Sequence, residues 1–261
     1  MDISCANYRE QRRIFCTLFE TDNPLRILFF HGKPGCGKTT LLQTCIEKDL
    51  PAGIRPIKYN FKNFIELDEI LDRVVDELGH ENMPSFTKEI SSLWRINQNV
   101  TMDKICQDGT GNLINVYLAL QTTNHEERDQ RRKYLARAWF DDLRNAPPII
   151  FVMDTYEKAG EEVRNWVECI FLERVRRTPN IYVLIAGQQT PDDHNVEWGH
   201  CCTAKELPGV HSAEDWLPVA RALNRCVPSK EWLAGVCHAL KGQPDEILTI
   251  IQDLPYERNA V

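Results

Sequence analysis

Apolar runs and apolar stripes alternate along the chain and predict most of its secondary structure. Uninterrupted apolar runs at 26–31, 149–153 and 181–186 are typical of strands buried on both faces of a parallel sheet. Shorter signals indicate two more strands at 54–59 and 203–207. Helical spacing of apolar residues predicts helices over 38–46, 67–78, 127–144 and 161–177, and then, after Pro208-Gly209, over 212–225, 229–240 and 244–254.

This order of elements predicts two structural units. Strands and helices alternate first, and helices alone follow. We therefore expect an α/β core with a parallel five-stranded sheet over residues 1–208, and a small helical domain over residues 209–261. Residues 80–125 give weaker signals: a helix at 87–96, a turn at 108–111 and an apolar segment at 113–120.

Composition narrows the class of protein. Hydrophobic residues make up 43% and charged residues 26% of the 261 residues, which is typical of a globular protein. Each of these apolar runs, Ile149 to Met153 among them, is far shorter than the roughly 20 residues of a membrane span. The N-terminal residues have no apolar stretch typical of a signal peptide. The net charge of −7 makes nucleic acid an unlikely partner.

The cysteines point to a reducing compartment. Ten cysteines are present without any C-x-x-C pair, so we expect reduced thiols and a cytoplasmic protein. One group has the residue types of a metal site, but its spacing fits no standard zinc pattern, and we interpret its members as ordinary loop residues: His194, His200, Cys201 and Cys202.

The strongest motif follows the first strand and satisfies G-x-x-x-x-G-K-[ST]. In this phosphate-binding loop, or P-loop, glycines let main-chain N–H groups converge on an anion at the N-terminus of a helix. We expect Lys38 to neutralise the β- and γ-phosphates and Thr39 to bind Mg²⁺. The predicted nucleotide contacts are Gly32, Lys33, Pro34, Gly35, Cys36, Gly37, Lys38, Thr39 and Thr40.

Two later strands end in side chains that would complete such a site. Asp154 is the first polar residue after the run 149–153, and we expect it to hold the magnesium shell together with Thr39. Glu157 lies three residues further and is a candidate to polarise the attacking water; the alternative is a solvated loop or helix-cap acid. Gln188 follows the run 181–186 and either contacts the γ-phosphate or is an exposed strand end.

The combination resembles the STAND class of P-loop ATPases, which are related to AAA+ proteins and include the NACHT and NB-ARC proteins. The resemblance covers nearly the whole chain. The spacing of Asp154 and Glu157 is similar to that of NACHT proteins, and the form Asp-Thr-Tyr-Glu looks most similar to prokaryotic members. It implies that Arg9, in Asn7-Tyr8-Arg9-Glu10, lies beside the adenine. It also implies that Pro244, in Gly242-Gln243-Pro244, packs near the adenine from a helical lid.

The resemblance implies an ASCE/AAA+-like fold and a regulatory ATPase. ATP or ADP with Mg²⁺ would bind between core and lid, and slow hydrolysis would reset the switch. Many relatives have an arginine where this chain has Gln188. Relatives also join the ATPase to effector and sensor domains and self-associate when ATP binds. Only 31 residues precede Gly32 here, so we expect an excised or a naturally minimal module.

Two other functions remain open from the residues. A small-molecule phosphotransferase would need catalytic arginines, and the basic clusters 131–133 and 174–177 are interpreted as solvated helix faces. An AAA+ protein that loads onto DNA would share the core and lid, but the acidic charge disfavours it.

Overall fold

The computed structural model describes residues 8–97 and 125–256. Five parallel strands form one sheet in the order β2-β3-β4-β1-β5. Their bounds are β1 Ile27–His31, β2 Arg55–Asn60, β3 Ile149–Asp154, β4 Ile181–Gly187 and β5 Cys202–Glu206. Because all strands are parallel, the residues that follow β1, β3 and β4 meet at one edge of the sheet, where α/β proteins bind ligands.

Successive residues of the central strands feed two separate cores. In β1, Ile27 and Phe29 pack into one cluster, while Leu28 and Phe30 pack into the other. All four side chains are fully buried. This explains why these strands have continuous apolar sequences: each face of the sheet is covered by helices.

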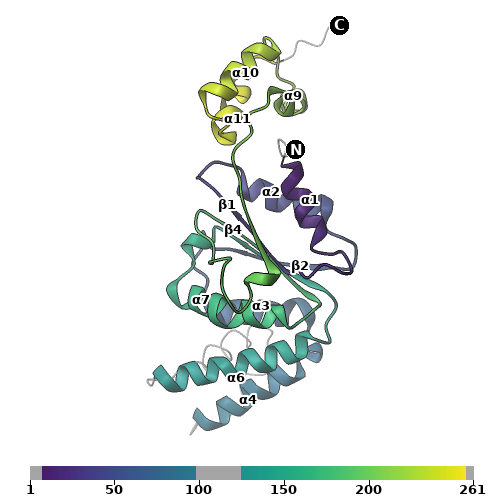
Figure 1. Cartoon of the computed structure of the whole chain (residues 1–261). Coiled ribbons are helices and arrows are strands. Elements are labelled where there is room, and N and C mark those ends of the chain that lie inside the picture. The colour runs from purple at the N-terminus through teal and green to yellow at the C-terminus, as the bar shows by residue number, and fades with distance from the viewer. Residues whose placement is uncertain (1–7, 98–124, 257–261) are drawn as a thin grey trace.

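One face of the sheet is covered by helices whose apolar sides share a cluster with Phe29 and Phe151. They are α3 Leu67–Leu78, α4 Pro84–Asn97, α6 His125–Leu143, α7 Glu161–Trp166 and α8 Leu172–Arg176. In Figure 1, α4 and α6 lie together as an outer layer beyond α3 and α7. Asp142 connects α6 to α4. Its carboxylate accepts hydrogen bonds from the main-chain N–H groups of Ser85 and Phe86, at 3.1 and 2.8 Å, in the first turn of α4.

The opposite face is covered by the N-terminal helix α1 Arg9–Thr17 and by α2 Lys38–Thr44. Three C-terminal helices, which we call the lid, lie at the end of the molecule where the strands finish (Figure 1): α9 Ala213–Ala222, α10 Lys230–Ala239 and α11 Pro244–Asp253. Their buried side chains, among them Trp216 and Ile247, belong to the same cluster as Leu28 and Leu207. The lid therefore shares a core with this face of the sheet.

The structure confirms the predicted five-stranded parallel sheet with flanking helices. The weak helix signal at 87–96 corresponds to α4, whereas α1 was not predicted. Two predicted helices contain π-helical turns, at Cys45–Asp49 and Val167–Phe171. The turn expected at 108–111 and the apolar segment at 113–120 lie outside the described residues. Within residues 8–97 and 125–256, no helix has the length and apolarity needed to cross a membrane.

Candidate functional site

The loop between β1 and α2 is shaped by two glycines. Gly35 and Gly37 have φ angles of 74° and 87°, in the left-handed region that favours glycine. The next residues, Lys38, Thr39 and Thr40, form the first turn of α2, where main-chain N–H groups have no partner within the helix. The loop and helix end therefore offer the row of N–H donors that binds phosphate in other proteins.

Lys38 lies against its own loop. Its ammonium donates to the carbonyl oxygens of Gly32 and Lys33, at 2.8 and 2.9 Å, and lies 3.6 Å from the Cys36 sulfur. Burial raises the pKa of the Cys36 thiol, an effect that Lys38 offsets only in part. The thiol is therefore neutral near pH 7, and the positive charge of this loop comes from its two lysines, Lys33 and Lys38.

The lid contacts the loop directly. The side-chain amide of Gln243 donates to the carbonyl of Pro34 at 3.1 Å, and the main-chain N–H of Asp245 donates to the carbonyl of Gly35 at 3.2 Å. A Cβ on Gly35 would lie 3.0 Å from the Asp245 carboxylate, so the close approach also depends on glycine. Residues 209 positions apart thus meet at the phosphate-binding loop.

Tyr8 and Pro244 flank Gly37. The Tyr8 side chain is buried, and its hydroxyl donates to the carbonyl of Cys36 at 2.5 Å. A Cβ built on Gly37 would lie 3.7 Å from the Tyr8 ring and 3.9 Å from the Pro244 ring. Arg9 is exposed at the first residue of α1, next to Tyr8. The two positions proposed for the adenine, Arg9 and Pro244, therefore belong to segments that meet at the loop.

A cavity of about 480 Å³ lies between this loop, the segment after β5 and the lid. Its lining includes Lys33 and Cys36 from the loop, Pro208 from the segment after β5, and Lys241 and Pro244 from the lid. A volume of this size is in the range of small-molecule sites. The cavity therefore leaves space between the core and the lid for a ligand that is bound to the loop.

Thr39 and Asp154 form the candidate metal position. The Thr39 hydroxyl donates to Oδ2 of Asp154 at 2.8 Å. Asp154 is the last residue of β3 and is 8% exposed, so its carboxylate is held next to α2. A hydroxyl and a carboxylate are oxygen ligands suited to Mg²⁺, and the pair fits the metal that a nucleotide site of this kind uses.

Glu157 is held at the end of β4. Its carboxylate accepts the main-chain N–H of Gln188 at 2.9 Å and the side-chain amide of Gln188 at 3.2 Å. Thr155 has φ 59° and ψ 41°, an uncommon left-handed conformation for a β-branched residue, and it starts the short turn that carries Glu157. A Cβ on Gly187 would lie 2.7 Å from the Glu157 carboxylate, so glycine at this strand end permits the contact.

The sequence interpretation missed three of these contacts. Tyr8 was quoted only as part of a motif, and no pattern indicated that its hydroxyl would bond to Cys36. Gln243 lies in the quoted Gly-Gln-Pro motif, where only the proline was singled out. Gly187 had a usable signal, since a glycine that ends a buried strand indicates a close approach of another group.

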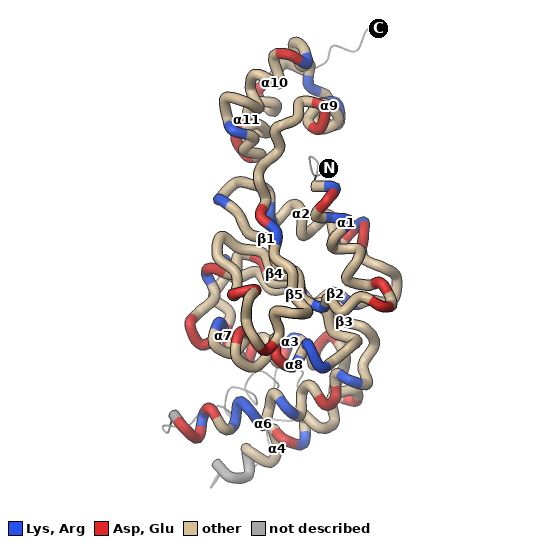
Figure 2. Tube along the Cα trace, in the orientation of Figure 1, with Lys and Arg blue, Asp and Glu red and all other residues tan. Residues whose placement is uncertain are grey.

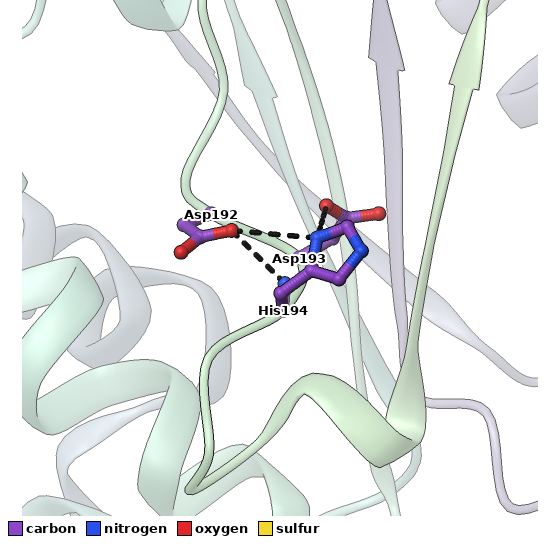
Figure 3. A group of neighbouring side chains, drawn as sticks. All are labelled: Asp192, Asp193 and His194. Atoms are coloured by element: carbon purple, nitrogen blue, oxygen red, sulfur yellow. Dashed lines mark hydrogen bonds and ion pairs between the residues drawn. The ribbon is translucent and has the colours of Figure 1, made fainter.

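The histidine and cysteine group does not form one cluster. His194 instead lies beside two acids, with ring-to-carboxylate distances of 3.6 Å to Asp192 and 3.0 Å to Asp193 (Figure 3). Cys201 is buried and its thiol contacts the carbonyl of Trp198 at 3.0 Å. The interpretation as an ordinary loop residue is therefore confirmed for His194. Cys201, by contrast, is a core residue.

The basic cluster 131–133 was wrongly interpreted as a solvated face. Arg131 is 4% exposed and pairs with Glu127. Arg132 pairs with Asp129 and with Glu162 of α7. Figure 2 shows these basic residues interspersed with acidic ones along α6.

Comparison with solved structures shows where this fold occurs. The chain is similar to the Walker-type ATPase of Pyrococcus abyssi, with 13% identity and a TM-score of 0.51, over 95% of this chain and 67% of that one. It is also similar to Cdc6p of Pyrobaculum aerophilum, with 15% identity and a TM-score of 0.52, over 94% of this chain and 60% of that one. No family model and no curated protein matches the chain. The chain thus has the fold of a Walker-type P-loop ATPase.

Proposed function

We propose that this chain is an ATP-binding module that hydrolyses ATP slowly and acts as a nucleotide switch of the STAND type. The observation that carries the proposal is the hydrogen bond from Thr39 to Asp154, because it joins the phosphate-binding helix to the acidic end of β3 at 2.8 Å. In a P-loop ATPase this pair holds the magnesium shell beside the γ-phosphate. Bound Mg²⁺ neutralises charge that develops on the phosphate oxygens.

The other residues of the site take roles that follow from their positions. Main-chain N–H groups of residues 35–40 bind the phosphates, and Lys38 exchanges its carbonyl partners for phosphate oxygens. Glu157 accepts a proton from the attacking water, and Gln188 positions the Glu157 carboxylate. Each carboxylate oxygen keeps a lone pair in these contacts, so Glu157 can accept that proton while Gln188 holds it in place.

The switch part of the proposal rests on the lid. Gln243 and Asp245 bond to the loop that receives the phosphates, so a phosphate that reshapes the loop alters the docking of residues 209–261 on residues 1–208. Tyr8, Arg9 and Pro244 border the adenine. By the same resemblance, we propose cytoplasmic effector and sensor partners and self-association in the ATP state.

Turnover by two matched variants tests the proposed chemistry. Glu157→Gln removes the proton acceptor but keeps the size of the side chain and one oxygen that can accept a hydrogen bond, so we expect kcat to fall by about 10²–10⁴-fold with ATP affinity retained. Glu161→Gln changes an exposed acid four residues away and should leave kcat unchanged. Phosphate production at saturating Mg·ATP measures both. An unchanged kcat in Glu157→Gln would remove Glu157 from the reaction.

A further inference from the structure

A second cavity, of about 250 Å³, opens beside the candidate metal position. It lies between α2, the carboxyl ends of β2 and β3, and α3. Thr39 and Asp154 form part of its wall, so it adjoins the position where the γ-phosphate and its metal are expected. We call it the β2 cavity.

The β2 cavity extends from the metal position to the protein surface. Asp154 at one side is buried, whereas Gln43, Lys58 and Asn63, which also line the cavity, are exposed. Apolar side chains such as Leu42 complete the lining. A small ion formed next to Asp154 would therefore have a direct way to solvent along this wall.

The charged groups that line the cavity are two cations, Lys58 and Arg73, and two carboxylates, Glu69 and Asp154. Arg73 donates to the carbonyl of Lys58 at 2.6 Å and to Glu69 at 2.8 Å, and its guanidinium lies 5.0 Å from the centre of the Tyr59 ring. Arg73 is therefore paired with Glu69, and the two charges offset each other. Lys58 has no ion pair within the described part of the chain, so its ammonium is available to a ligand.

The opposite side of the phosphate-binding loop is covered. Gln243 and Asp245 of the lid and the Tyr8 hydroxyl hold the carbonyls of Pro34, Gly35 and Cys36. On the side of β2, a phosphate ion can leave without displacing any of these contacts.

We infer that the β2 cavity binds inorganic phosphate and is its exit route after hydrolysis. The inference rests on the proposed function. Water adds to the γ-phosphorus, the bond to the bridging oxygen breaks, and ADP keeps that oxygen and its electrons. The products are ADP, hydrogen phosphate and a proton. The phosphate passes Asp154 and is held by Lys58 and the carboxamide of Gln43 before it reaches solvent.

Blocking the cavity separates formation of phosphate from its release. Asn63→Trp places a large ring at the exposed wall, and Asn63→Ala is the matched control. In a single turnover, acid quenching measures phosphate formed, and a fluorescent phosphate-binding protein measures phosphate released. We expect Asn63→Trp to form phosphate at the wild-type rate and to release it several-fold more slowly. Release that keeps pace with formation in Asn63→Trp would overturn the exit route.

Phosphate affinity gives a second readout that needs no turnover. Inorganic phosphate is titrated into the Mg·ADP-loaded protein. We expect Lys58→Ala to weaken its binding by about three- to tenfold, because one exposed positive charge is lost, while Lys62→Ala outside the cavity has no effect. Equal phosphate affinity of wild type and Lys58→Ala would contradict phosphate binding in the β2 cavity and would leave the proposed hydrolysis unaffected. A wild-type protein that forms no phosphate contradicts the proposed hydrolysis and the exit route together.

Discussion

Single residues of the site are placed by contacts that span the whole sequence. Thr39 and Asp154 are 115 positions apart and share a hydrogen bond because β1 and β3 end at the same edge of a parallel sheet. Glu157 and Gln188 meet for the same reason at the ends of β3 and β4. These pairings follow from topology, so the strand signals and the P-loop motif were enough to predict Thr39 and Asp154 as partners.

Other residues could not be predicted because their partners depend on side-chain geometry. Gln188 was expected either at the γ-phosphate or as an exposed strand end; it is exposed directly after β4, and its bonds to Glu157 were not expected. Arg131 lies in a charged stretch, yet it is buried because α6 is covered on that side. The spacing of apolar residues indicates which positions of an element are buried. It does not indicate which charged side chains form hydrogen bonds or ion pairs.

Asp72 is a residue whose burial has a measurable cost. It is 3% exposed on α3, its Oδ1 has no hydrogen-bond partner in the described residues, and burial raises its pKa to about 6, with Asp76 and Asp68 adding to the shift. An unfolded aspartate has a pKa of about 3.9, so the unfolded state loses its proton first as pH rises. Stability therefore falls between about pH 4 and pH 6 and then levels off.

Asp72→Asn should remove this cost. We expect the free energy of unfolding to rise by on the order of 1–3 kcal/mol at pH 7.5, with the gain vanishing near pH 4. Urea unfolding at both pH values measures it, with Glu77→Gln as an exposed control on the same helix. A gain of equal size at pH 4 would show that ionisation of Asp72 is not the cause.

At the scale of elements, the fold could be predicted wherever a segment kept one pattern of apolar residues along its length. The strands β1, β3 and β4 are buried on both faces and have continuous apolar runs, so their positions were predicted within a few residues. Helix α1 was missed because it is nine residues long and mostly polar, with Gln11 and Phe15 as its buried residues. The π-helical turns after α2 and α7 add one residue to a turn, and a period of 3.6 does not reveal them.

The segment between β5 and α9 controls how the lid is seated. Gly209 has a φ of 94°, and a Cβ there would lie 2.7 Å from the carbonyl oxygen of Gly242. The next residue, Val210, donates its N–H to the same carbonyl at 2.7 Å. We call this close contact of residues 209–210 with Gly242 the crossing. It joins the start of the lid to the turn that precedes Pro244.

Gly209→Ala should therefore loosen the lid. The added methyl group opens the crossing, so we expect bound nucleotide to dissociate several-fold faster, as stopped-flow release of a fluorescent ADP would measure. Gly235→Ala is the matched control, because a Cβ there meets nothing within 4 Å and should stabilise α10 by about 0.5–1 kcal/mol. If both variants release nucleotide at the wild-type rate, the crossing does not hold the lid closed.

At the scale of the whole molecule, the proposed nucleotide site joins three distant parts of the chain. The N-terminal Tyr8, the phosphate-binding loop and the lid residues 243–245 are adjacent because the lid lies beyond the strand ends, next to the N-terminal segment (Figure 1). The order of elements predicted a core and a helical lid. The contacts between them came from the structure, since hydrogen bonds over 209 positions leave no local pattern.

The most direct test of this account is the binding of radiolabelled ATP in the presence of Mg²⁺, measured by equilibrium dialysis. We expect one ATP per chain for the wild type. Lys38→Ala removes charge-assisted contacts to phosphate and should weaken binding by about 10- to 100-fold. Lys88→Ala, an exposed lysine on α4, should bind as the wild type does. A wild-type chain without affinity for ATP, or a Lys38→Ala variant with undiminished affinity, would contradict the assignment of this loop as the nucleotide site.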